Sequence, residues 1–219
     1  IFILADDLGW GDLSCYGNPY FKTPNLDRLA AQGTLYTNFY VNGSVCSPSR
    51  CAFMTGQYPA RHRIHGHYAT HELNAARGMS NWLDPKVPNV AALLRPAGYV
   101  TAHFGKWHLG AGQGAPPPSD YGFTESRTVN ANGPSWDEPD LTFRAKSSAA
   151  IVDETIRFVT AHKNQPFYVN AWMLIPHATL NPTEEQMKPY QNLSPGGAGF
   201  PFKSAEQIFF SSVTDMDQQ

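Results

Sequence analysis

The stretch VPNVAALLRPAGYVTAHF (residues 87–104) predicts a helix over 87–95, a glycine turn and a strand over 99–104. Pro88 suits a first helical turn, because the N–H that proline lacks is not needed there. Pro96 and Gly98 then end the helix and let the chain turn back. A helix that returns through a short turn to a strand is typical of α/β proteins.

Two further apolar runs extend this pattern. Residues 1–5 and 166–174 are hydrophobic segments rich in strand-forming residues, which suits strands buried on both faces of a parallel sheet. Capped or amphipathic segments predict helices over 23–33, 147–164 and 203–219, and a short helix over 51–56 with Pro48 suited to its first turn. We therefore predict an α/β fold with a mostly parallel central sheet and helices on both faces.

The connecting segments are predicted from turn residues and from the lack of periodicity. Residues 34–40 are strand-like, and 57–87 read as a loop. Residues 111–146 are rich in Gly, Pro, Ser and Asn and predict a long excursion over the sheet edge. Residues 181–203 predict a loop with a short helical piece near 183–188. The chain begins inside an apolar run and ends inside a predicted helix, so we expect the sheet fold to be incomplete at both ends.

Composition excludes several functional classes. The chain has 219 residues, 42% of them hydrophobic, and a formal net charge of −2, which gives no support to nucleic-acid binding. No apolar run has the length of a membrane-spanning helix, and no signal peptide is visible. Three cysteines without a C-x-x-C spacing argue against a disulfide framework and against a zinc–thiolate site.

Polar side chains follow each predicted strand. Asp6 and Asp7 follow the first, Lys106 and His108 the second, and His177 the third. In open α/β sheets, functional sites lie beyond the carboxyl ends of the strands. Asp6 and Asp7 can converge only if the strand ends there, and a hard cation such as Ca²⁺ or Mg²⁺ would relieve their repulsion. An Asp-rich turn or helix cap is the alternative interpretation.

Lys106 and His108 would share one face of the chain if the strand continued through them. That arrangement would place an ammonium group and an imidazole side by side. A surface lysine and a structural histidine are the competing interpretation. His65, His67 and His71, in the loop over 57–87, could be imagined as zinc ligands. We favour a loop that faces an anionic substrate, or simply a solvated loop, because no helix or strand is predicted to hold these histidines.

The motif Cys46-Ser47-Pro48-Ser49-Arg50 predicts an oxyanion site. It places a thiol just before a helix N-terminus, with Arg50 one turn further on and Gly56 as the helix stop. Backbone N–H groups and the helix dipole favour an anion at that end. The planar guanidinium of Arg50 suits sulfate or phosphate.

These motifs, in this order, resemble the N-terminal half of the type I, formylglycine-dependent sulfatases, a branch of the alkaline-phosphatase-like superfamily. The segment Cys46–Arg50 is highly specific for that family. Asp6–Gly9 and Gly105–Gly110 support the resemblance strongly, and Pro176-His177 supports it by its position. The similarity leans towards arylsulfatases and N-acetylgalactosamine-6-sulfatases. It implies that residues 1–219 are the N-terminal portion of a single sulfatase catalytic domain whose C-terminal remainder is absent.

The resemblance implies a catalytic role for each motif. Cys46 would be oxidised to formylglycine by a formylglycine-generating or anaerobic sulfatase-maturating enzyme, and the hydrated aldehyde would attack the sulfur of a sulfate ester. Asp6 and Asp7, with the modified Cys46, would hold Ca²⁺ or, alternatively, Mg²⁺. By the same resemblance, Arg50 would orient the modified residue and Lys106 would neutralise charge. His108 would form a hydrogen bond to the modified residue or act as a base, and His177 would protonate the leaving oxygen.

The resemblance also sets expectations for partners and location. A sulfated carbohydrate or aryl sulfate would be the substrate, and family members are mostly periplasmic, secreted or lysosomal. The remaining metal ligands and a second sulfate-binding lysine of the family fall beyond residue 219. Asp215 and Asp217 lie on the last predicted helix and should not replace those ligands. We therefore expect residues 1–219 alone to bind Ca²⁺ poorly and to hydrolyse little.

Three alternatives stay open at this point. A phosphodiester or phosphonate ester hydrolase of the same superfamily could use the same metal, arginine and helix dipole. A catalytically silent, sulfatase-like binding protein would keep Cys46 as a thiol. A cytosolic thiol enzyme would use Cys46 with a lowered pKa, but it would leave Asp6 and Asp7 unexplained.

Overall fold

The structure is a computed structural model that describes residues 1–136, 143–192 and 203–219. Its contacts divide the chain into two units. The first unit comprises Ile1–Leu4, Tyr40–Glu138 and Asp153–Met173. The second comprises Ala5–Phe39, Pro139–Val152 and Leu174–Gln219.

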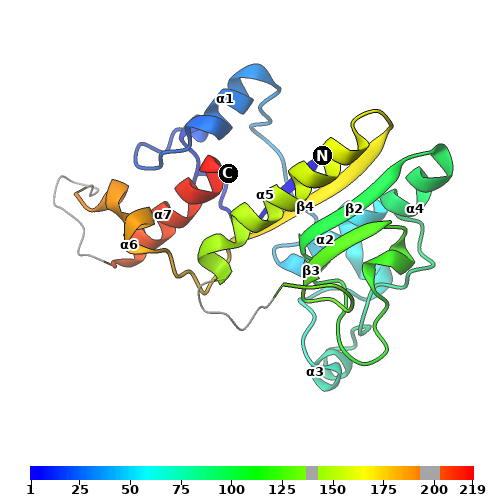
Figure 1. The fold of residues 1–219 in the computed structure, drawn as a ribbon. Coiled ribbons are helices and arrows are strands. Elements are labelled where there is room, and N and C mark those ends of the chain that lie inside the picture. Colours follow the sequence, from blue (N-terminus) through cyan, green and yellow to red (C-terminus); the bar gives the residue numbers. More distant parts are fainter. Residues whose placement is uncertain (137–142, 193–202) are drawn as a thin grey trace. The chain divides into compact units, whose positions relative to one another are not determined.

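The described residues form strands, α-helices and 3-10 turns in an alternating order (Figure 1). The strands are β1 (Phe2–Asp6), β2 (Val100–Lys106), β3 (Glu125–Val129) and β4 (Phe167–Pro176). The α-helices are α1 (Pro24–Gln32), α2 (Cys46–Thr55), α3 (His71–Ala76), α4 (Val90–Leu94), α5 (Phe143–His162), α6 (Glu184–Met187) and α7 (Ala205–Gln218). The 3-10 turns are Ser14–Tyr16, Pro59–His62, Arg95–Ala97, Pro118–Tyr121 and Lys188–Tyr190.

The sheet confirms the predicted fold class. In the described part of the chain the strands form one four-stranded sheet in the order β1-β4-β2-β3. β2 pairs in parallel with both β3 and β4, in a register that aligns Lys106 with Val129 and Gly105 with Trp172. Parallel pairing requires long crossover connections, and helices make up much of these connections here.

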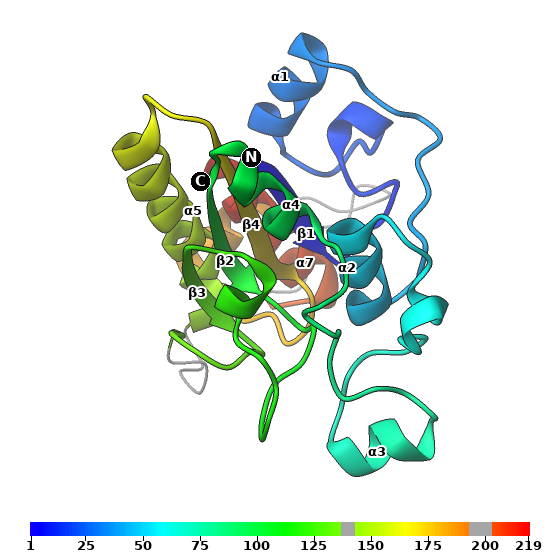
Figure 2. The same cartoon turned by 90° about the vertical axis from the view of Figure 1, so that its right-hand side faces the viewer.

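Both faces of the sheet are covered within the first unit. Figure 2 shows α2 and α4 on one face and α5 on the other. The side-chain alternation of β2 explains the division, because Phe104 packs edge-on against Phe158 of α5, whereas His103 points to the opposite face. There, His103 contacts the ring of Trp172 from β4. The hydrophobic core cluster includes the fully buried Trp107, Tyr121 and Trp172.

The second unit is held together by helices at distant positions in the sequence. Figure 1 shows α6 beside α7. Asp217 near the end of α7 accepts hydrogen bonds from the backbone N–H groups of Asn25 and Leu26, at 3.1 and 2.7 Å. These N–H groups belong to the first turn of α1 and have no partner within the helix. Asp217 therefore caps the start of α1.

Two predictions about strands were wrong. No strand forms over 34–40, where Tyr36, Phe39 and Tyr40 are exposed, because β-forming side chains need a neighbouring strand to pair with. Conversely, the predicted excursion over 111–146 contains β3, which adds to the edge of the sheet beside β2. β3 is short and polar, so its sequence alone carries little strand signal.

Several helix boundaries also differ from the predictions. Pro88 lies before helix α4, and Asn89 is its N-cap, with Oδ1 accepting the N–H of Ala92 at 3.1 Å. Helix α5 begins at Phe143, four residues earlier than predicted, and the loop over 57–87 contains the short helix α3. The helical piece near 183–188 is confirmed as α6, which Thr183 and Gln186 start with a capping box.

Candidate functional site

The predicted site residues fall into two groups, one in each unit. Cys46, Arg50, Lys106 and His108 belong to the first unit. Asp6, Asp7 and His177 belong to the second.

Cys46 is the first residue of helix α2, whereas the sequence predicted it just before the helix start. Val45 is the N-cap, and its side chain makes no capping hydrogen bond to the N–H groups of the first turn. The preceding loop lies close against this turn, because a Cβ added at Gly43 would lie 2.7 Å from Cβ of Pro48. The helix ends at Gly56, whose φ of 66° is the left-handed conformation that glycine adopts without strain.

Arg50 is buried beneath this helix start. Its side chain has 1% relative exposure, and Nη1 donates a hydrogen bond to the backbone carbonyl of Lys106 at 2.8 Å. The guanidinium carbon lies 4.9 Å from the ring centroid of Trp172, within the range of a cation–π interaction. The structure therefore brings together two of the predicted residues, Arg50 and Lys106, through the main chain of the lysine.

Lys106 is the last residue of β2 and is buried. His108 does not continue the strand, because its φ is +52°, in the left-handed region. The idea that the two side chains share one face of an extended segment was therefore wrong. Backbone bonds from Trp107 and His108 to the carbonyls of Val129 and Asn130 hold the turned segment beside β3.

The imidazole of His108 is oriented by a backbone group. Nε2 lies 3.0 Å from the carbonyl oxygen of Tyr68. A carbonyl only accepts hydrogen bonds, so Nε2 carries the proton and Nδ1 has the lone pair of the neutral ring. The N–H of Tyr68 donates to Oγ of Ser47, also at 3.0 Å. The Tyr68 residue thereby links His108 to the residue directly after Cys46.

The three thiols differ in their surroundings. Cys51 is fully buried within α2, and burial raises its pKa to about 11. Burial, and then the charge of Asp27, raises the pKa of Cys15. Cys46 is partly exposed at the helix start. Cys46 is thus the cysteine whose position combines access from solvent with a helix N-terminus.

In the second unit, Asp6 ends β1 and is buried, whereas Asp7 has left the strand with a φ of +69°. This break meets the condition under which adjacent carboxylates can turn towards the same side. The Asp7 side chain is 56% exposed, and its Oδ2 lies 3.8 Å from Nε2 of His177.

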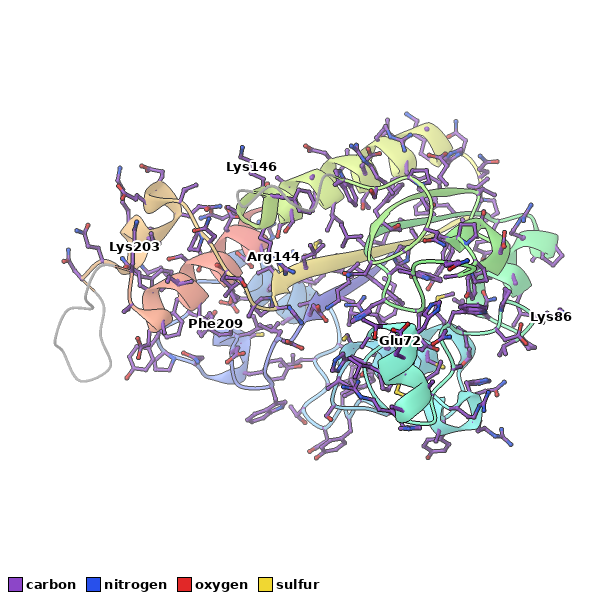
Figure 3. The ribbon with its side chains drawn as sticks, turned by 90° about the horizontal axis from the view of Figure 1, so that it is seen from below. Glu72, Lys86, Arg144, Lys146, Lys203 and Phe209 are labelled. Carbon is purple, nitrogen blue, oxygen red and sulfur yellow. The ribbon has the colours of Figure 1, made fainter. Side chains whose placement is uncertain are left out.

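His177 follows the last residue of β4. Its Nδ1 donates to the carbonyl of Ala178, which leaves the lone pair of the neutral ring on Nε2, the atom that faces Asp7. Arg144, at the start of α5 (Figure 3), donates from Nη1 to the carbonyl of His177 at 3.3 Å. The ring and the backbone of His177 are therefore both held by hydrogen bonds.

Asp6 and Asp7 suit a hard cation chemically, since carboxylate oxygens are the ligands that Ca²⁺ and Mg²⁺ prefer. Ca²⁺ takes six to eight oxygen ligands, so two aspartates provide only part of a coordination shell. Among the residues that the structure describes, no group of three or more His, Cys, Asp or Glu side chains could hold a metal ion. An unmodified thiol at Cys46 would be a soft ligand that fits such a site poorly.

The histidines of the 57–87 loop do not form a metal site. Nε2 of His65 bonds the carbonyl of Arg77 at 2.9 Å, and His71 lies beside the ring of Trp82. The ring of His67 lies 6.5 Å from that of His108. The loop therefore reaches the surroundings of the predicted site residue His108.

Sequence reasoning missed three residues that support the first group, namely Tyr68, His103 and Trp172. His103 is fully buried, and burial, followed by the charge of Arg50, lowers its pKa to about 3. A buried aromatic on β4 and a histidine within β2 look like ordinary core residues in the sequence. No local signal shows that they surround Arg50.

No described helix is long and apolar enough to cross a bilayer.

Comparisons with known proteins identify relatives of this chain. The sulfatase family model covers residues 1–218. Human arylsulfatase A is 48% identical over 124 residues, which are 56% of this chain and 23% of that protein. The N-acetylgalactosamine-6-O-sulfatase of Bacteroides thetaiotaomicron is 36% identical over 196 residues, which are 87% of this chain and 36% of the relative. The chain therefore spans about a fifth to a third of these relatives.

Solved structures share the fold over almost the whole chain. Ps i-CgsB in complex with k-i-k-neocarrahexaose has a TM-score of 0.80 at 24% identity, over 99% of this chain and 52% of that one. The phosphonate monoester hydrolase of Agrobacterium radiobacter has a TM-score of 0.67 at 18% identity, over 99% of this chain and 56% of that one. The fold alone thus does not separate sulfate from phosphonate chemistry. The family match over residues 1–218, together with the motif at Cys46–Arg50, shows that the chain belongs to the sulfatase family.

Proposed function

We propose that this chain carries the nucleophile-bearing part of an enzyme that hydrolyses sulfate esters. One observation carries the proposal. In a chain of the sulfatase family, the motif Cys46–Arg50 begins helix α2, and its arginine is buried against the main chain of Lys106. A buried, permanently charged guanidinium close to a helix N-terminus favours an oxyanion.

Cys46 is proposed to be the site of conversion to formylglycine by a maturating enzyme. The hydrated aldehyde, when present, supplies two geminal hydroxyls, of which one attacks sulfur and the other assists release of sulfate. Arg50 orients residue 46 through the fixed position of its guanidinium. Lys106 provides a cation that offsets the negative charge accumulating on the sulfuryl oxygens.

The two histidines are proposed to move protons at defined atoms. His108 has its lone pair on Nδ1 when neutral, so Nδ1 is the atom that accepts a proton from the nucleophile. His177 has its lone pair on Nε2, so a proton taken up there can be given to the ester oxygen as the sulfur–oxygen bond breaks. The proton is then carried away with the alcohol.

Asp6 and Asp7 are proposed to hold Ca²⁺, or alternatively Mg²⁺, as part of a larger ligand set that also includes the modified residue 46. The cation would supply Lewis-acid activation of oxygen and neutralisation of sulfate charge. The chain's own contribution is the strand end at Asp6 and the left-handed turn at Asp7, which present two carboxylates.

A sulfated carbohydrate or an aryl sulfate is the proposed substrate. The curated relatives include arylsulfatase A and N-acetylgalactosamine-6-sulfatases, which suggests both classes. The exposed, basic 57–87 loop, with Arg61, Arg63 and Arg77, suits an anionic glycan better than a neutral one. An exported location is proposed from the family resemblance.

Mass spectrometry and kinetics on the full-length protein, produced with a maturating enzyme, test this proposal together. The peptide that contains residue 46 should show the mass of an aldehyde in place of a thiol, and a Cys46→Ala variant should lose turnover of an aryl sulfate. Each preparation should also be given the matching aryl phosphodiester and phosphonate ester. An unmodified thiol in natively produced protein, or turnover that favours the phosphorus esters, would overturn the proposal.

A further inference from the structure

The indole of Trp172 forms a surface on which the guanidinium of Arg50 lies. The guanidinium carbon is 4.9 Å from the ring centroid, Trp172 is fully buried, and Arg50 has 1% relative exposure. A cation over an indole face is attracted by the ring quadrupole, and the attraction is stronger where water is excluded. The buried setting therefore makes this contact a strong constraint on Arg50.

The strand register explains why a residue as large as tryptophan fits there. Trp172 of β4 lies opposite Gly105 of β2 in the parallel ladder. Residues paired in this way point to the same face of a sheet, and Gly105 has no side chain to occupy the space. The indole can therefore extend below α2, the helix that carries Arg50.

The indole is itself held in position from its edges. Phe2 of β1 packs edge-on at 5.9 Å between ring centroids, and His103 of β2 does so at 4.8 Å. His103 is fully buried, and its pKa is lowered to about 3, chiefly by burial and then by Arg50. At neutral pH it is uncharged, so it adds no second cation beside the guanidinium.

We propose that Trp172 is a positioning residue, which holds Arg50 in the orientation that aligns residue 46. The inference rests on the proposed function, because only that function gives Arg50 its role. The hydrogen bond to the carbonyl of Lys106 fixes one nitrogen of the guanidinium, and the ring face supports the guanidinium from the Trp172 side. Removal of the ring takes away the face against which the guanidinium lies.

Three variants of the full-length, matured protein test the proposal. Trp172→Leu removes the ring and should lower kcat about tenfold, with KM within about twofold. Trp172→Phe keeps a ring face and should recover most of the loss. Phe158→Leu is the matched control, because Phe158 is fully buried on the other face of the sheet, against Phe104. It should lower stability but leave kcat unchanged.

A double-mutant cycle shows whether the effect passes through Arg50. Arg50→Lys combined with Trp172→Leu should reduce kcat no further than Arg50→Lys alone. Equal kcat for Trp172→Leu and wild type, an equal loss in Phe158→Leu, or additive losses in the double variant would overturn the proposal.

The same cycle measured on unfolding separates this inference from the proposed function. The two substitutions should couple by about tenfold in the unfolding equilibrium constant if the ring holds the guanidinium. If the wild-type protein had no sulfatase turnover, the proposed function would fail. The coupling measured on unfolding would still test whether Trp172 holds Arg50, and additive effects of the two substitutions on unfolding would refute the proposal.

Discussion

The backbone carbonyl of Tyr68 accepts a hydrogen bond from Nε2 of His108 at 3.0 Å. The N–H of Tyr68 donates at the same distance to Oγ of Ser47, the residue after Cys46. One residue of the 57–87 loop thus orients a proposed proton carrier and braces the start of the helix that carries the proposed nucleophile.

Removing the Ser47 hydroxyl should disturb both ends of this link. Ser47 is fully buried, so Ser47→Ala leaves the N–H of Tyr68 without its acceptor and should cost about 1–3 kcal/mol of stability. We expect kcat to fall by about threefold to tenfold, because His108 and residue 46 lose their common support. Chemical denaturation and steady-state kinetics measure the two effects.

Ser80→Ala is the control for this prediction. Ser80 bonds the phenol oxygen of Tyr68 at 3.0 Å, and the backbone link does not depend on it. The control should lose some stability and keep its kcat. Similar kinetic losses in both variants would show that the Tyr68 peptide has no special role.

His103 should make the folded protein less stable in acid. Its folded-state pKa is lowered to about 3, from an ordinary value of 6.5. Between these values the unfolded chain binds a proton that the folded chain refuses, so stability falls as the pH drops below 6.5. A His103→Phe variant lacks this titration. The free-energy difference between wild type and variant should therefore change by about 2 kcal/mol between pH 7 and pH 4.5.

Denaturant unfolding of both proteins at the two pH values measures that difference. Titration of carboxylates affects both proteins alike and cancels. A difference that stays constant between pH 7 and pH 4.5 would show that His103 accepts a proton in the folded state.

The thiols should react in an order set by burial. In protein produced without a maturating enzyme, iodoacetamide at pH 8 should label Cys46 before Cys51. Cys51 is fully buried and its pKa is raised to about 11, so little thiolate is available. Cys15 should react more slowly than Cys46, because its pKa is also raised. Peptide mass spectrometry over time gives the order, and early labelling of Cys51 would contradict the structure.

The carboxylates of Asp217 and Asp7 should separate stability from metal binding. Asp217 accepts two N–H groups at the N-terminus of α1, where a negative charge is favourable. Asp217→Ala should lose about 2 kcal/mol of stability and keep the Ca²⁺ affinity of the full-length protein. Asp7→Ala should lower the Ca²⁺ affinity and keep the stability, because this side chain is largely exposed and is a proposed ligand.

Calorimetric titration with Ca²⁺, alongside thermal unfolding of the metal-free protein, gives both quantities for each variant. Removal of the metal with a chelator should abolish turnover by the wild type, and added Ca²⁺ should restore it. A loss of affinity in Asp217→Ala as large as that in Asp7→Ala would contradict the assignment.

Features that depend on local sequence were predicted well. The three apolar strands were found because a strand buried on both faces needs a continuous hydrophobic run. Helices α1 and α2 were found because Pro24 and Gly56 mark a helix start and a helix stop through their own backbone geometry. The order of motifs along the chain also pointed to the sulfatase family, which the match over residues 1–218 confirms.

The roles of the site residues stay predictions. The contact between Arg50 and the main chain of Lys106 was not predicted, because it joins positions 56 residues apart. The turn at His108 was missed for a related reason: its left-handed backbone is held by bonds to the segment after β3. β3 itself is a strand only because β2 offers it an edge.

The sequence by itself determined the cores of β1, β2 and β4, the start of α1, the end of α2 and the residues that carry the proposed chemistry, because each of these depends on neighbours a few positions away. Only the tertiary structure decided that Tyr68 orients His108 and that Trp172 lies under Arg50. These contacts join residues 40 and 122 positions apart, and no periodicity or spacing in a chain encodes which distant side chains will meet.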